Sequence, residues 1–202
     1  MGSNDFTWVG ALGGVNLFFF AWSATGATEL LAREHGVLEI AQLVLIALAF
    51  LMFAATSARS ERAARTAAIA LLGLSVLFFY RELDLSAFGV EGALAKLSQS
   101  NVRDVVVGIG TAGLLGYIIA KRADWSAWWR FATRAAAWPL FGTAIALVIG
   151  MVLSTTLKGD LQGQFWEELV EFNGYVFFLL AAGRHGALAA HEQVVERPIM
   201  PN

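Results

Sequence analysis

Ionisable side chains gather at the ends of several apolar segments of this chain. Carboxylate and guanidinium groups in such positions bind cations, relay protons or pair with one another. An arginine among carboxylates forms bidentate hydrogen bonds and keeps its charge when it is desolvated. The chain therefore carries a candidate site for an ion, a proton or a charged substrate. Its predicted members are Glu39, Arg81, Glu82, Asp84, Arg103, Asp104, Glu168 and Glu171.

Helical spacing determines which of these groups share a face. Glu168 and Glu171 are three residues apart, and Glu39 and Gln42 have the same spacing. Residues with this spacing lie on one side of a helix. The candidate site then holds six carboxylates and two arginines. Several carboxylates are left without a counter-charge even if both arginines are paired.

Three arrangements would resolve this excess of negative charge. Part of the carboxyl groups stay protonated, because burial and like-charge neighbours raise the pKa of a carboxyl group. Alternatively, a divalent cation lies among them, in which case Ca²⁺, Mg²⁺ or Mn²⁺ is favoured by the oxygen ligands. The candidate metal ligands are Glu39, Glu82 and Glu171. In the third arrangement the carboxylates are hydrated at the level of the lipid headgroups and bind nothing.

The composition indicates which environment holds these groups. Of the 202 residues, 57% are hydrophobic and 15% are charged, whereas a soluble domain carries about 25% charged residues. Lipid is therefore the expected surrounding of most of the chain. The absence of cysteine excludes disulfides and iron–sulfur clusters. A net charge of -2 without a basic run gives no reason to expect nucleic acid as a partner.

Six apolar segments are long enough to cross a bilayer, which needs roughly 20 apolar residues per helix. The alternation typical of barrel strands is absent, so the sequence predicts an all-α polytopic bundle of about six spanning helices within residues 1–184. Residues 185–202 are expected to form a cytoplasmic tail. The predicted spans are 7–28, 37–57, 66–84, 103–121, 135–157 and 165–183.

The distribution of basic residues predicts the orientation of this bundle. With both termini in the cytoplasm, nine basic residues face inwards and five face outwards. The candidate site then lies on the outer side of a multi-pass protein, which we expect in a cell membrane of the bacterial inner-membrane type. An amphipathic helix at the interface is predicted over 123–134, and an outer loop over 85–102.

Several other chemistries lack the residues that they need. The three histidines, His35, His185 and His191, are too dispersed for one zinc site. No serine-hydrolase elbow occurs, and the glycine-rich segment 108–113 lies within a predicted helix rather than after a strand. Haem is not expected, because Met52 and Met151 have no axial partner at matched depth.

Three functions remain after these exclusions. The favoured one is a small transport or cation-binding and proton-binding protein that uses the outer carboxylates. The second is an accessory or assembly subunit of a membrane complex, whose charges are structural. The third is a membrane-embedded enzyme in which the carboxylates act on lipid headgroups. The expected partners are the lipid bilayer and either a second copy or a partner membrane subunit.

Overall fold

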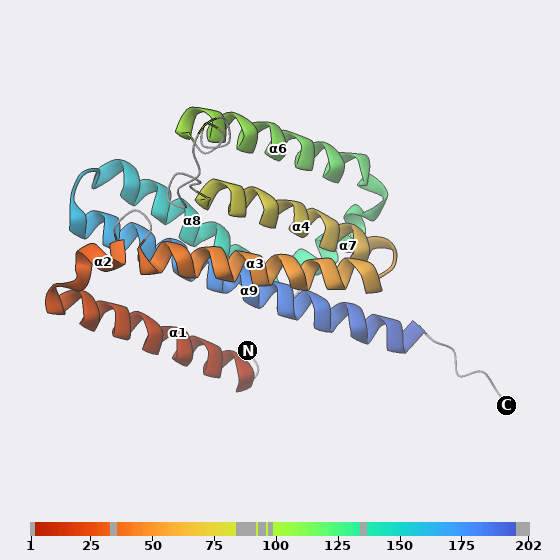
Figure 1. Cartoon of the computed structure of the whole chain (residues 1–202). Helices are drawn as coiled ribbons and strands as arrows, with labels where there is room; N and C mark the ends of the chain where they lie inside the picture. Colours follow the sequence, from red (N-terminus) through yellow and green to blue (C-terminus); the bar gives the residue numbers. More distant parts are fainter. Residues whose placement is uncertain are drawn as a thin grey trace. The chain divides into compact units, whose positions relative to one another are not determined.

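The regular elements of the computed structural model are all helical over the residues that it describes, namely 3–32, 36–83, 92, 96, 99–133 and 137–196. The prediction of an all-α fold is confirmed for these residues (Figure 1). In chain order the elements are α1 (Ser3–Trp22), the π-helical turn η1 (Ser23–Ala27), α2 (Thr28–Ala32), α3 (Val37–Arg59), α4 (Arg62–Glu82), α6 (Ser100–Ala120), the 3-10 turn η3 (Arg122–Asp124), α7 (Trp125–Ala132), α8 (Trp138–Thr156) and α9 (Leu161–Glu196).

Four helices in the described part of the chain are long and apolar enough to cross a membrane. They are the second to fifth of the six predicted segments, so those four predictions are confirmed. Their lengths agree with a rise of about 1.5 Å per residue and a hydrocarbon core about 30 Å thick. The four candidate spans are Val37–Arg59, Ala63–Glu82, Asn101–Ala120 and Trp138–Thr156.

The prediction of six spans is therefore corrected to four candidate spans in the described residues. The sixth predicted segment, 165–183, lies in α9, which has 36 residues and carries three carboxylates in that stretch. These charges make it a poor span by composition, because each is costly in hydrocarbon. The first segment, 7–28, comprises most of α1 and η1, where Gly26 has a φ of 89° and interrupts regular helical geometry. Side chains before Gly10 lie outside the described residues.

The chain divides into two compact units, and the first comprises residues 1–44 and 139–178. It contains α1, η1, α2, the start of α3, nearly all of α8 and the first half of α9. Aromatic packing joins α1 to α9, where the rings of Phe19 and Phe172 lie 5.6 Å apart between centroids. Gly174 of α9 lies close to Ala146 of α8. The first half of α9 is thus in contact with two other helices of this unit.

The second unit comprises residues 45–138 and 179–202. Its helices α4 and α6 run side by side (Figure 1), and Gly110 of α6 leaves the space that the Leu77 side chain of α4 occupies. The second half of α9 packs on α3 here, because the ring of His185 lies 6.4 Å from that of Phe53. The helix predicted over 123–134 is present as η3 and α7.

Two other predicted segments are described only in part. Within the predicted loop 85–102, the structure describes residues 92, 96 and 99–102, and α6 already begins at Ser100. The predicted cytoplasmic tail comprises residues 185–202, of which the structure describes 185–196 as the end of helix α9.

Candidate functional site

The first half of α9 carries the carboxylates of unit 1. The helix begins after a turn in which the Asp160 carboxylate accepts a hydrogen bond of 3.0 Å from the Gly163 N–H. This is the arrangement of an N-cap, which satisfies one of the open N–H groups at a helix start. Glu168 and Glu171 follow on the same helix, and they differ in environment. Glu168 is half-buried, whereas Glu171 is only 3% exposed.

Glu171 is buried against α8 because that helix has a glycine at the point of contact. A Cβ atom added to Gly150 would lie 2.7 Å from Glu171 Cγ and 3.0 Å from Glu171 Oε1. Gly150 is six residues from the end of α8 at Thr156, which is about 9 Å along a helix axis. The carboxyl group of Glu171 therefore lies beside the interior of a candidate span, not beside its end.

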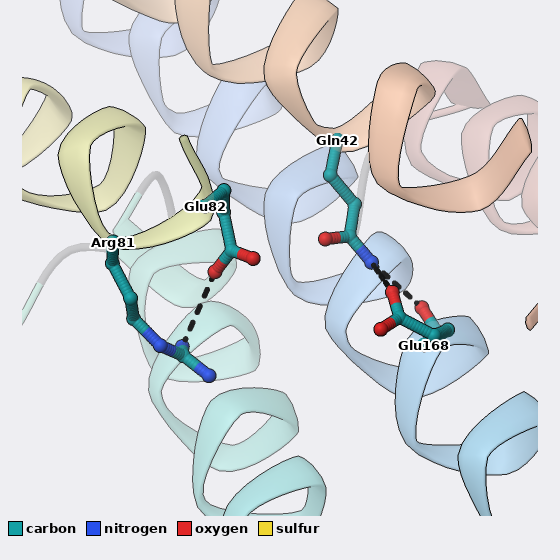
Figure 2. Close-up of polar contacts among 4 residues, drawn as sticks. All are labelled: Gln42, Arg81, Glu82 and Glu168. Atoms are coloured by element: carbon teal, nitrogen blue, oxygen red, sulfur yellow. Dashed lines mark hydrogen bonds and ion pairs between the residues drawn. The ribbon is translucent and has the colours of Figure 1, made fainter. Parts of the chain in front are cut away.

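Glu168 is held by Gln42 of α3 in the same unit. Gln42 is fully buried, and its Nε2 donates hydrogen bonds to the Glu168 main-chain oxygen at 3.0 Å and to Glu168 Oε2 at 2.9 Å (Figure 2). Both partners are acceptors, which determines the orientation of the carboxamide. Glu39 lies one turn earlier on α3 and is half-buried.

A pair of carboxamides links α1 to α9. Asn16 Nδ2 donates to Asn173 Oδ1, and Asn173 Nδ2 donates to Asn16 Oδ1, each at 2.8 Å. Each Nδ2 also donates to the main-chain oxygen four residues earlier in its own helix. Hydrogen bonds between helices are typical of contacts in lipid, because a polar group without a protein partner cannot bond to water there. We call this contact the asparagine pair.

The arginines of the predicted site belong to unit 2. Arg81 Nη1 lies 3.6 Å from Oε1 of its neighbour Glu82, and their side chains are 39% and 12% exposed (Figure 2). Such a partly exposed pair contributes little to stability. Arg103 is half-buried and Asp104 is exposed in the first turns of α6. Asp84 lies outside the described residues.

The structure thus brings Glu168 together with Gln42, and Arg81 together with Glu82. No three His, Asp or Glu side chains of the described residues are grouped so that they could hold a metal ion. Of the candidate metal ligands, Glu39 and Glu171 belong to unit 1 and Glu82 belongs to unit 2, so the divalent-cation arrangement stays a prediction. Gly150 and the asparagine pair were not among the predicted site residues, and neither was Gln42. Two signals in the sequence pointed to Gln42 and to the asparagine pair: the spacing of Gln42 from Glu39, and the position of Asn16 and Asn173 within apolar segments.

Comparison with protein-family models, curated proteins and solved structures gives no match to this chain. That the chain is a membrane protein is therefore inferred from the length and apolar composition of its own helices. With four candidate spans in the described residues, the chain is a multi-pass integral membrane protein in contact with the lipid bilayer.

Proposed function

We propose that this protein takes up and releases a small cation, the proton included, at the carboxyl groups of Glu168 and Glu171 in unit 1. The burial of Glu171 beside Gly150 carries the proposal. An ionisable group at membrane depth is costly, and it is found where it faces the interior of a bundle and serves an ion or proton pathway.

Two further observations support this proposal. Gln42 donates to Glu168, and a hydrogen bond donated to a carboxylate favours its charged form. The two carboxyl groups share one face of α9, since they are three residues apart. A cation that reaches Glu168 is therefore within one helical turn of Glu171.

Proton uptake into vesicles tests the proposal. The full chain is reconstituted into liposomes, a potassium gradient with valinomycin sets the potential, and a trapped dye reports internal pH. We expect the unmodified chain to take up protons and Glu171→Gln to abolish uptake, because glutamine has the same size but does not ionise. The matched control is Glu29→Gln, at an exposed carboxylate of α2 in the same unit.

The three possible outcomes are distinct. Loss of uptake in Glu171→Gln with normal uptake in Glu29→Gln supports the proposal. Equal uptake by all three proteins, or no uptake above that of empty liposomes by the unmodified chain, contradicts it. Size-exclusion chromatography and circular dichroism establish that each variant is folded.

A second function, that of a subunit in a membrane complex, is favoured by α6. None of the apolar window of α6 is buried, whereas 22% to 28% is buried in the other three candidate spans. Ile109, at the middle of α6, is 69% exposed. The chain has no cysteine, so an Ile109→Cys variant carries a single thiol. Disulfide-linked dimers formed in native membranes would support a contact through α6, and a purely monomeric product would contradict contact with a second copy there.

A further inference from the structure

The carboxamide of Gln42 has one atom that the contacts with Glu168 do not use. Its Nε2 makes two hydrogen bonds to Glu168, while its Oε1 is buried and accepts no hydrogen bond in the described structure. The residue as a whole is 0% exposed. Figure 2 shows the side chain directed at Glu168, with the nitrogen towards the carboxylate and the oxygen on the other side of the carboxamide.

A buried acceptor of this kind calls for a hydrogen-bond donor. Buried polar atoms are nearly always paired, and an unpaired one destabilises the fold. Within the hydrocarbon core of a membrane there is no bulk water that could donate this hydrogen bond. Reversing the carboxamide would not help, because its oxygen would then face the two oxygens of Glu168. The hydrogen-bond donor to Gln42 Oε1 therefore has to be an N–H or O–H group that belongs to neither Gln42 nor Glu168.

The charge beside Gln42 defines the donor further. Glu168 Oε2 lies 2.9 Å from Gln42 Nε2, so a group on Oε1 is only the width of one carboxamide from a carboxylate. A carboxylate has about four lone-pair positions, so it has the capacity to accept more hydrogen bonds than the one from Gln42. A positively charged donor is therefore favoured over a neutral one.

A metal ion fits these contacts less well than an N–H cation does. Calcium takes six to eight oxygen ligands and magnesium about six in octahedral geometry, and no three acidic or histidine side chains of the described residues are grouped for such a role. An ammonium group needs only a few acceptors, since each N–H makes its own directed bond.

We propose that Gln42 Oε1 and the Glu168 carboxylate together bind ammonium or a primary alkylammonium group. The Gln42 oxygen accepts one N–H, and Glu168 supplies the second acceptor and the counter-charge. This inference rests on the proposed function, because it names the class of cation that unit 1 takes up. Glu171, on the same face of α9, is the next carboxyl group that the bound cation would meet.

Thermal unfolding of the full chain in phosphatidylcholine nanodiscs tests this inference. Four chloride salts are compared at equal concentration: ammonium, methylammonium, potassium and tetramethylammonium. Potassium resembles ammonium in size, and tetramethylammonium has the same charge, but neither has an N–H group. We expect ammonium and methylammonium to raise Tm in a saturable manner, and the other two salts to leave it unchanged.

Two substitutions locate the effect. Gln42→Met removes the acceptor at similar volume, and we expect it to abolish the rise in Tm. Gln164→Met is the matched control, because Gln164 is an exposed glutamine of α9 in the same unit. Should Gln42→Met fail to fold, Glu168→Gln serves instead. It keeps Gln42 but removes the charge, and we expect a half-saturating ammonium concentration at least about tenfold higher.

Each result decides the inference separately from the proposed function. A rise in Tm with all four salts, with potassium as strong as ammonium, or with none of them, overturns the inference. So does a full ammonium response in folded Gln42→Met or, if that variant does not fold, in Glu168→Gln. In that case proton uptake that depends on Glu171 would still support the proposed function. Conversely, an ammonium response that needs Gln42, in a chain without uptake, supports the binding site and contradicts transport.

Discussion

Gly150 is the position where a single methyl group should have the clearest effect on unit 1. In the Gly150→Ala variant the new Cβ would lie 2.7 Å from Glu171 Cγ and 3.3 Å from Glu171 Cδ. Carbon atoms in contact are normally about 3.5 to 4.0 Å apart, so Glu171 or the backbone of α8 has to move. Overpacking of this kind costs about 1–3 kcal/mol.

A second term opposes this cost. Alanine is favoured over glycine within a helix by about 0.8–1.0 kcal/mol. The net result expected for Gly150→Ala is a loss of between about zero and 2 kcal/mol in the free energy of unfolding. In a Glu171→Ala background the clash is absent, because Cγ and the carboxyl group are gone. There Gly150→Ala should stabilise the protein by up to about 1 kcal/mol.

The assay is a double-mutant cycle. Unfolding in a denaturing detergent is followed by circular dichroism and by the fluorescence of the seven tryptophans. Gly113→Ala on α6 is the control, since no atom lies within 4 Å of a Cβ added there, and it should be neutral or slightly stabilising. A coupling energy near zero between Gly150→Ala and Glu171→Ala would refute the packing of Glu171 against Gly150.

Further predictions concern the asparagine pair and the spans. Asn16→Leu should lower the free energy of unfolding by about 1–2 kcal/mol, because Asn173 loses its partner on α1. The double variant Asn16→Leu/Asn173→Leu should regain most of this loss. The same detergent titration measures both variants, and equal losses in the single and double variants would argue against the asparagine pair. Single-cysteine variants Glu61→Cys and Ala123→Cys should react with an impermeant maleimide from one side of the membrane and Lys158→Cys from the other, since an odd number of candidate spans separates Lys158 from each. Reaction of all three from the same side would contradict the four spans.

The spans were predictable because lipid imposes a length. Helices α3, α4, α6 and α8 are uninterrupted apolar runs close to the roughly 20 residues that a bilayer requires. Helix α9 was not predicted with its correct extent, because its apolar stretch is flanked by charges on both sides. Helical structure continues through Arg184 and His185 where hydropathy alone places an end.

The candidate site was predictable in its residue types and less so in its contacts. The sequence shows that Glu168 and Glu171 share a face, but it cannot show that Gln42, 126 residues away, donates to Glu168. Arg81 lies 3.6 Å from its own neighbour Glu82, and its predicted pairing with carboxylates of other helices stays a prediction. The role of Gly150 was unpredictable, because the sequence does not show which side chain packs against a glycine in an apolar helix.

The asparagine pair has a consequence for how unit 1 responds to membrane voltage. A transmembrane potential acts on net charge, with about 2.3 kcal/mol per elementary charge per 100 mV. The two carboxamides that link α1 to α9 are neutral, and their four side-chain hydrogen bonds are satisfied within the two helices. The link between these helices is therefore insensitive to voltage. The change of charge proposed for Glu171, two residues away on α9, would leave the attachment of α1 the same.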